Sequence, residues 1–526
     1  MANNVKPKYV EKEHKKVDVW RYKKYLCKVK VINIQTGKRI VLLNTDEAKD
    51  HDVYTGYRTE VKFNSHSLVA IVDTSSDLIN HGQVGIYKEL AEDLGLGDGS
   101  TVEIVHLNRP ASLEYIKKKM DGENLTDLQI NTIVEDIMDG KLGEAETAAW
   151  VSAAYMKGFS DSEIVALANA TVKSGDHLDL GKKGVVDKHC SGGVAGNRTT
   201  MLIVPIIACT ELYIPKTSSR AITSAAGTAD AVEVLAEVNF SIEELKEIVL
   251  KSHGAMVWGG GIKLAPVDDR LIRIRNPLSL DPEGMLLASI LGKKKSVGAK
   301  YVIIDIPVGR GAKFADMDKA QDLAKHFIKI GSTMGMDVEA LITDGAEPVG
   351  NGIGPGLECR DVLEVLEGQG PEDLRHKACT MAGKLLELCG KTIKGKGYDV
   401  ANNLLKNGKA LKKFREIIEL QGGDGKVKSS DVPVGHYKYD VKADVDGQIF
   451  HIDNKVISKI ARIAGAPMDK GAGIYLDMLR GDRVKKGDKL FTIHAESETK
   501  LDFAIKALKD LEPFEMRRMV LGVVDD

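Results

Sequence analysis

Short strand-like runs alternate with helical segments through the middle of this 526-residue chain, and this alternation constrains the fold more than any other feature. A helix opens among these runs at Ser241, where Glu244 completes a capping box. Chains of this pattern form a mainly parallel sheet covered by helices, and ligands bind at the carboxyl ends of the strands. The strand-like runs are Val185–Val186, Met201–Cys209, Tyr213–Ile214, Ala255–Trp258 and Tyr301–Ile306.

On either side of this region the spacing of apolar residues changes, so we divide the chain into four domains. Apolar and polar positions alternate from about Val29 to Asn108, which predicts a small β-rich domain over residues 1–108. Residues 109–180 have a helical period, with capping boxes at Thr126 and Ser160. Residues 181–430 form the α/β domain and end in a glycine-rich stretch, 421–430, that we expect to be a linker. Residues 431–526 return to strands and predict a C-terminal α+β domain. The fold class is therefore multidomain α/β.

Composition excludes several classes of protein. Lys plus Arg (74) nearly balances Asp plus Glu (76), so no global field attracts nucleic acid or a membrane. The longest uncharged apolar run, Met201–Cys209, is too short to span a bilayer. The first twenty residues lack the apolar stretch of a signal peptide. Six scattered cysteines without a CxxC pair indicate neither a zinc site nor a disulfide framework, and they suit the cytoplasm.

Two glycine- or hydroxyl-rich loops each lie between a strand and a helix. The first, 187–199, contains Lys188, Gly192 and Gly193. Its glycines let backbone N–H groups approach an anion, and the following helix terminus favours negative charge. The second loop, 217–228, contains one arginine and six hydroxyl side chains, more than one helix cap requires. Both loops also fit tight turns and caps, but together they predict an anion-binding crevice.

The second loop carries a resemblance to a known family. Ser218–Glu233 resembles the signature segment of the thymidine and pyrimidine nucleoside phosphorylases, and Val186–Gly193 resembles their phosphate loop. Leu264–Arg270 and Ile290–Lys294 fit the same family, over a region from Arg109 to the C-terminus. With its extra N-terminal domain, the chain is most similar to the archaeal AMP phosphorylases. This resemblance implies the class II nucleoside phosphorylase fold, with about 268–297 returning to the helical domain.

The resemblance also implies an activity, the conversion of AMP and phosphate to adenine and ribose 1,5-bisphosphate. It makes Asp281 the general acid that protonates the leaving base, a role that needs burial or nearby negative charge to raise the pKa of that carboxyl. Asp281, which precedes Pro282, also fits a helix N-cap. The implied phosphate-binding residues are Lys188, Ser218 and Thr199, and the implied AMP-binding residues are Gly193, Ser219, Arg220, Ala221, Ile222, Thr223, Ser224, Thr228, Ser289 and Lys313.

Departures from the nucleoside-cleaving pattern favour a nucleotide substrate. Cys190 stands where those enzymes usually have Ser, and Ser218–Ala221 and Ser224–Gly227 replace glycine-rich stretches of the family. Lys313 follows a strand, and we assign it to the 5′-phosphate that only a nucleotide carries. A solvated loop lysine is the alternative. Arg275 and Lys293 match base-contacting positions of the pyrimidine enzymes, and His189 fits either a base contact or a packed histidine.

Other functions remain open at this point. A pyrimidine nucleoside phosphorylase shares the motifs, and an anthranilate phosphoribosyltransferase-like enzyme shares the fold but would need magnesium. Asp230 and Glu233 are the only acidic cluster near the loops that suggests a metal. A non-catalytic scaffold is the alternative outside enzymology. We expect no metal and no cofactor, with phosphate as co-substrate, AMP and other nucleoside monophosphates as substrates, and a homodimer or larger homo-oligomer.

Overall fold

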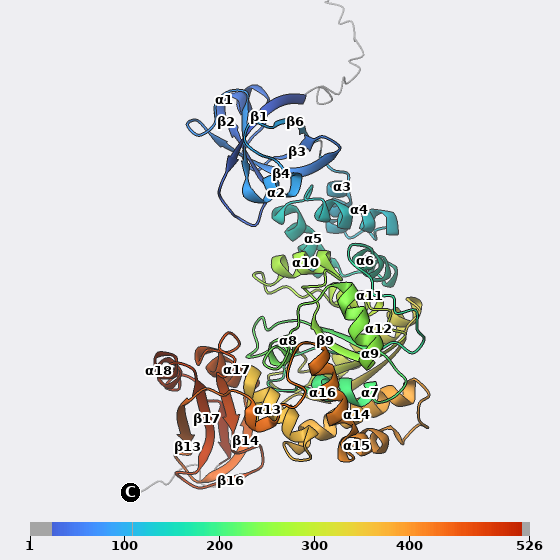
Figure 1. Ribbon diagram of the computed structural model, residues 1–526, viewed down its shortest axis with the longest axis vertical. Helices are drawn as coiled ribbons and strands as arrows, with labels where there is room; N and C mark the ends of the chain where they lie inside the picture. The colour runs from blue at the N-terminus through green and yellow to red at the C-terminus, as the bar shows by residue number, and fades with distance from the viewer. Residues whose placement is uncertain (1–23, 108, 518–526) are drawn as a thin grey trace, which may run out of the picture. The chain divides into compact units, whose positions relative to one another are not determined.

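The computed structural model describes residues 24–107 and 109–517, and Figure 1 shows their helices and strands. The chain forms two compact units, 1–153 and 154–526, which are described separately below. None of the described helices is long and apolar enough to cross a membrane.

The first unit contains a closed six-stranded barrel in the order β1-β5-β2-β4-β3-β6. Its inward positions are small and β-branched, and Val41, Val61, Val72 and Ile104 are fully buried. The alternation in the sequence therefore predicted this β-rich domain correctly. The strands are β1 (Lys24–Ile32), β2 (Ile40–Asn44), β3 (Arg58–Phe63), β4 (His66–Ser75), β5 (Gln83–Tyr87) and β6 (Thr101–His106), with short helices α1 (Thr45–Asp50) and α2 (Lys88–Leu94).

Four helices follow the barrel: α3 (Ser112–Met120), α4 (Asp127–Met138), α5 (Glu144–Lys157) and α6 (Asp161–Lys173). Both predicted capping boxes are present, at Thr126 with Gln129 and at Ser160 with Glu163. In the second unit, α11 (Glu283–Ser296) packs on α6. At Gly292 the two helices are so close that a Cβ would lie 3.3 Å from the carbonyl oxygen of Ala168.

The central sheet is parallel, as the alternation of strands and helices predicted. Strands β7 (Val186–Cys190), β10 (Tyr301–Val308) and β11 (Asp337–Asp344) pair in the order β11-β10-β7. Strands β8 (Ile214–Ser218) and β9 (Gly254–Trp258) form a second parallel pair. A parallel bridge between Val185 and Tyr213 connects the two groups. The carboxyl ends of β7 and β8 therefore lead directly into the two candidate loops.

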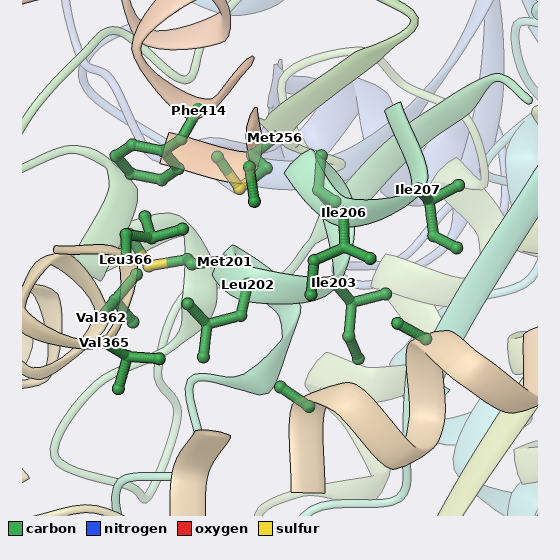
Figure 2. Close-up of a cluster of buried hydrophobic side chains, with 14 of the residues drawn as sticks. Met201, Leu202, Ile203, Ile206, Ile207, Met256, Val362, Val365, Leu366 and Phe414 are labelled. Carbon is green, nitrogen blue, oxygen red and sulfur yellow. The ribbon is translucent and has the colours of Figure 1, made fainter. Parts of the chain in front are cut away.

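The prediction of a strand at Met201–Cys209 is wrong, because this run forms helix α7 (Thr199–Ala208). All ten residues of α7 are buried. A helix enclosed on all sides has no polar face, so its sequence lacks the 3.6-residue period that identifies surface helices. Figure 2 shows Met201, Leu202, Ile203, Ile206 and Ile207 of α7 within the surrounding apolar core.

Helices surround the sheet and its loops. They are α8 (Thr228–Val232), α9 (Ile242–Ser252), α10 (Pro266–Arg275), α12 (Met317–Thr333), α13 (Pro355–Leu366), α14 (Glu372–Leu388), α15 (Gly397–Lys406) and α16 (Lys409–Leu420). We predicted that residues 421–430 form a linker. The first residue of this stretch, Gln421, instead belongs to the core of the domain. The Gln421 side chain is fully buried, accepts a hydrogen bond from the Met256 amide, and donates to the carbonyls of Met256 and Glu237. In the sequence, a glutamine beside several glycines is typical of a solvated loop, and only the fold shows its buried partners.

The C-terminal part is α+β, as predicted. One sheet has the order β12-β15-β17-β13, a second has the order β16-β14-β18, and β12 comes from the central domain. Its elements are β12 (Gly352–Ile353), β13 (Tyr437–Lys442), β14 (Gly447–Ile452), α17 (Asn454–Ile463), β15 (Gly473–Leu476), β16 (Arg483–Val484), β17 (Lys489–Ala495), α18 (Glu498–Ala507) and β18 (Phe514–Arg517).

Candidate active site

The first loop connects the end of β7 to the start of α7. Lys188 is only 2% exposed, and its Nζ donates to Thr199 Oγ1 at 3.0 Å and to Thr200 Oγ1 at 3.2 Å. Burial lowers the pKa of Lys188, and the charges of Lys377 and Arg198 act in the same direction. The predicted phosphate residues Lys188 and Thr199 therefore lie in direct contact at a helix N-terminus, where backbone donors and the helix dipole also favour an anion.

Two residues predicted to bind AMP lie next to each other at this loop. Gly193 has φ +90°, and a Cβ at this position would lie 2.5 Å from the backbone nitrogen of Lys313. Only glycine permits both the left-handed backbone and this close approach. The loop after β10 therefore packs on the loop after β7, as the shared edge of a parallel sheet requires.

The second loop leaves β8 at Ser218, whose hydroxyl oxygen is buried without a hydrogen-bond partner in the described part of the chain. Thr228 is the first residue of α8. Arg198, which the sequence reasoning did not single out, donates to Thr228 Oγ1 at 2.8 Å and to the Ala226 carbonyl at 3.2 Å. It also forms an ion pair with Glu358. Arg198 therefore connects the end of the first loop to the second.

Acidic side chains shape the second loop from within. Asp230 Oδ2 accepts the backbone N–H groups of Ala221 at 2.7 Å and Gly227 at 2.9 Å. Arg220 forms a bidentate ion pair with Glu233, both contacts at 2.6 Å, and lies over the Trp258 ring. These contacts assign Asp230 and Glu233 a structural role in the loop. They also show that the Arg220 charge is already neutralised by a carboxylate.

The predicted general acid lies between two cations. Asp281 forms ion pairs with Lys313 and, at 3.5 Å, with Arg275, and its side chain is 38% exposed. We expected deep burial or a negative neighbour, but among the described residues the ion-pair partners of Asp281 are both cations, and its side chain is not deeply buried. The alternative role of Asp281 as a helix N-cap is wrong, because Pro282 is the N-cap of α11 and no side chain caps it. The fold therefore brings Asp281, the predicted general acid, into contact with Lys313, the predicted ligand of the 5′-phosphate.

Ser289 belongs to a buried polar cluster around Asp268. Asp268 Oδ2 accepts a hydrogen bond from Ser289 Oγ at 2.7 Å and pairs with Lys293 Nζ at 2.6 Å. Burial opposes ionisation of Asp268, but Lys293 and Arg275 outweigh it and lower the pKa of that carboxyl. Lys293 and Ser289 are thereby held by one carboxylate, whereas Arg275 pairs with Asp281. Only its position in the family motif Leu264–Arg270 distinguished Asp268 in the sequence.

A second buried carboxylate holds two lysines on the same face of β7 as His189. Asp187 pairs with Lys294 at 2.7 Å and with Lys216 at 3.8 Å. Burial and the charge of Lys294 lower the pKa of Lys216 to about 7. Burial and the lysines around it also hold the pKa of His189 well below its usual range, so its imidazole is neutral at pH 7. A charged residue inside a strand, as at Lys216, is the sequence signal that could have identified this group.

Asp305 of β10 lies opposite Cys190 of β7, so it is on the other face of the sheet from His189. Asp305 accepts a hydrogen bond from Thr343 at 2.6 Å and lies 3.4 Å from Lys377. Although burial acts against it, the charges of Lys377 and Lys188 lower the pKa of Asp305. Asp305 interrupts the apolar run Tyr301–Ile306, which marks it in the sequence as a paired residue. Cations around the two loops are thus numerous and individually positioned, as an anion site requires.

Three family models match the chain. The helical bundle domain of a glycosyl transferase family matches residues 113–175, and the a/b domain of that family matches 182–411. The pyrimidine nucleoside phosphorylase C-terminal domain matches 449–514.

Curated relatives match along nearly the whole chain. The AMP phosphorylase of Pyrococcus furiosus is 45% identical over 95% of this chain and 99% of its own length. Those of Methanococcoides burtonii and Thermococcus kodakarensis are 45% and 44% identical, each over 94% of this chain and 98% of their own length. The solved anthranilate phosphoribosyltransferase of Thermus thermophilus is 17% identical, with a TM-score of 0.50 over 59% of this chain and 99% of its own, which is a likeness of fold alone.

Proposed function

Because this chain belongs to the AMP phosphorylase family, we propose that it catalyses the phosphorolysis of AMP and other nucleoside 5′-monophosphates. In this reaction the base–ribose bond breaks and a phosphate oxygen bonds to the same ribose carbon. The products from AMP are adenine and ribose 1,5-bisphosphate. The observation that carries the proposal is 45% identity to an AMP phosphorylase over 95% of the chain.

In the proposed reaction, inorganic phosphate binds at Lys188, Thr199 and Ser218. The contact of Lys188 with Thr199 at a helix N-terminus and the unpartnered hydroxyl of Ser218 support this assignment. AMP binds along Gly193, the run from Ser219 to Ser224, Thr228, Ser289 and Lys313. Breaking the glycosidic bond builds positive charge on the ribose and negative charge on the base, which leaves well only when protonated.

Asp281 supplies that proton in our proposal. Its carboxyl must be protonated to do so, and in the structure its ion-pair partners are Lys313 and Arg275. A nucleotide phosphate that attracts Lys313 would remove one of these cations from Asp281. We propose no metal or organic cofactor for this reaction.

We also propose a cytoplasmic location. All six cysteines are free thiols, which suits the reducing cytoplasm. We also propose a homodimer or larger homo-oligomer, because the helical segment resembles the dimer-forming surface of the phosphorylase family.

One experiment tests the reaction class and the substrate together. The protein is incubated with AMP, CMP, UMP or thymidine, with and without phosphate, and the free base and sugar product are identified. We expect base release from the nucleotides only with phosphate, and ribose 1,5-bisphosphate as the sugar product. Equal release without phosphate would indicate a hydrolase, and turnover of thymidine alone would indicate the nucleoside phosphorylase.

A further inference from the structure

One face of the central sheet places a buried carboxylate next to the start of the first loop. Lys188 and Cys190 of β7 are two residues apart, so both side chains lie on the same face of the sheet. Asp305 of β10 is the register partner of Cys190 and shares that face. Asp305 is fully buried and Lys188 is 2% exposed. The lysine assigned to inorganic phosphate therefore shares a buried surface with a carboxylate.

Helix α14 supplies a second cation to this face. Lys377 Nζ lies 3.4 Å from Asp305 Oδ2, and its side chain is 11% exposed. In Figure 1, α14 is labelled beside α7, and it packs on both α7 and β10. Val186 and Ile303, on the same face of the sheet, belong to the same buried core cluster as the apolar residues of α14. Lys377 therefore reaches Asp305 from the helix that covers this face.

The contact between Asp305 and Lys377 is a charge pair without a hydrogen bond. Within the described part of the chain, Asp305 Oδ2 and Lys377 Nζ are both buried and neither forms a hydrogen bond. The other carboxylate oxygen, Oδ1, accepts only the neutral hydroxyl of Thr343, at 2.6 Å. A buried carboxylate is costly unless positive charge compensates it. Lys377 lowers the pKa of Asp305 more than Lys188 does, so Lys377 is its main compensating charge.

Lys188, in contrast, has neutral partners. Its Nζ donates to the hydroxyls of Thr199 and Thr200, and among the described residues it forms no ion pair with a carboxylate. Hydroxyl groups leave the positive charge of an ammonium uncompensated, so an anion can still balance it. The pairing of Asp305 with Lys377 and of Lys188 with hydroxyls is therefore the arrangement that leaves Lys188 free for phosphate.

Loss of the Lys377 charge would disturb this arrangement in two ways. Asp305 would attract Lys188, because charges interact strongly in a buried setting of low dielectric constant and a lysine side chain is flexible. The uncompensated carboxylate would also repel a phosphate at the first loop. The backbone couples the two places directly, since the Ser191 N–H of that loop donates to the Asp305 carbonyl at 2.9 Å.

We propose that Lys377 is a positioning residue for inorganic phosphate: by compensating the charge of Asp305, it keeps Lys188 available to bind the attacking phosphate. Lys377 acts through Asp305 and Lys188 and does not itself contact the phosphate. This inference rests on the proposed function, because it concerns the phosphate that the proposed reaction consumes. It goes beyond that function by assigning a task to a residue of α14 that no sequence motif indicated.

Lys377→Met tests the proposal, because methionine keeps the length of the side chain without its charge. We expect KM for phosphate to rise at least about tenfold, the effect of losing the charge-assisted contact between Lys188 and phosphate. KM for AMP and kcat at saturating phosphate should change by much smaller factors. Lys377→Gln, which can still donate a hydrogen bond to Asp305, carries the same expectation if the methionine variant does not fold. Lys384→Met is the matched control, since Lys384 lies on the same helix and pairs with Glu387 at 3.0 Å.

The double variant Lys377→Met/Asp305→Asn separates a charge effect from a packing effect. It removes the cation and the carboxylate together, so nothing on this face attracts Lys188 away from phosphate. We expect KM for phosphate to return most of the way to the wild-type value, a coupling that a double-mutant cycle measures. If the double variant keeps the full loss of the single variant, Lys377 either contacts phosphate itself or only supports the fold, and the proposal is overturned.

Calorimetric binding of inorganic phosphate, without nucleotide, distinguishes failure of this inference from failure of the proposed function. Weaker phosphate binding by Lys377→Met, recovered in the double variant, supports the role of Lys377 independently of turnover. If the wild type neither binds phosphate nor releases base with it, the proposed function fails and this inference fails with it. If the wild type does both and Lys377→Met binds phosphate as tightly as the wild type, only the role of Lys377 is overturned.

Discussion

At the scale of single residues, the Asp281–Lys313 ion pair connects two positions that the sequence assigned to different tasks. Asp281 was predicted to protonate the base and Lys313 to bind the 5′-phosphate. Their contact means that changing either residue alters the charge beside the other. Variants at both positions must therefore be compared on a nucleotide and on a nucleoside.

Asp281→Asn should lower kcat far more than it raises KM. Protonation of the leaving base matters only in the transition state, and general acid catalysis contributes about 10²- to 10⁴-fold. Steady-state kinetics with AMP measures the loss. Glu283→Gln is a matched control, because Glu283 is an exposed carboxylate two residues further on that pairs with His326. A kcat for Asp281→Asn within about threefold of wild type would exclude Asp281 as the acid.

Lys313→Ala should lower kcat/KM for AMP by about 10- to 150-fold, the effect of a charge-assisted hydrogen bond worth roughly 1.5–3 kcal/mol. Adenosine lacks the 5′-phosphate, so its kcat/KM should fall by a smaller factor. The two substrates are measured side by side on the same preparation. The same loss for both would restrict Lys313 to its contact with Asp281.

At the scale of secondary-structure elements, helix α13 carries two buried carboxylates. Glu358 pairs with Arg198, and Asp361 Oδ2 accepts the N–H groups of Asn351 and Gly352, both at 2.7 Å. Burial raises the pKa of each carboxyl to about 7. Glu358 therefore holds the candidate loops through Arg198, and Asp361 holds the start of β12. Burial of these carboxylates in their charged form costs free energy of folding.

The raised pKa values predict a pH dependence of stability. In the unfolded chain the pKa of Asp361 is about 3.9. Between about pH 4 and 7 the Asp361 carboxyl is therefore protonated in the folded protein and ionised in the unfolded chain. The free energy of unfolding should fall as pH rises through this window, because the charged form is buried. Asp361→Asn should flatten that slope in urea titrations at pH 5 and 8, whereas Asp344→Asn, at an exposed carboxylate, should preserve it. Identical slopes for Asp361→Asn and wild type would contradict the prediction.

At the scale of the second compact unit, Asn454 attaches the C-terminal domain to the phosphate loop. Asn454→Ala removes hydrogen bonds to Ala195 and Gly345, worth about 1 kcal/mol each. We expect KM for phosphate to rise by up to about 30-fold, with a smaller change in kcat, because the loop is less often in its binding arrangement. Asn407→Ala, at an exposed asparagine, is the control for the same substitution elsewhere. An unchanged KM would show that the loop keeps its arrangement without α17.

Local sequence patterns determined most of the secondary structure that we predicted correctly. Period-two alternation identified the barrel strands, and capping boxes identified the starts of α4, α6 and α9, because such signals depend on neighbours in the chain. The two loops followed from glycine, hydroxyl and strand positions. Helix α7 was mistaken for a strand because its burial on every side comes from distant helices, which no local period records.

Only the tertiary structure decided which charges pair. Lys313 with Asp281, Arg220 with Glu233 and Ser289 with Asp268 join residues from separate elements. Arg462 of α17 contacts a loop more than 200 residues earlier in the chain. Electrostatic energy depends on distance in space and on burial. The sequence by itself therefore determined which chemical groups surround the site, and the fold determined which of them remain available for an anion.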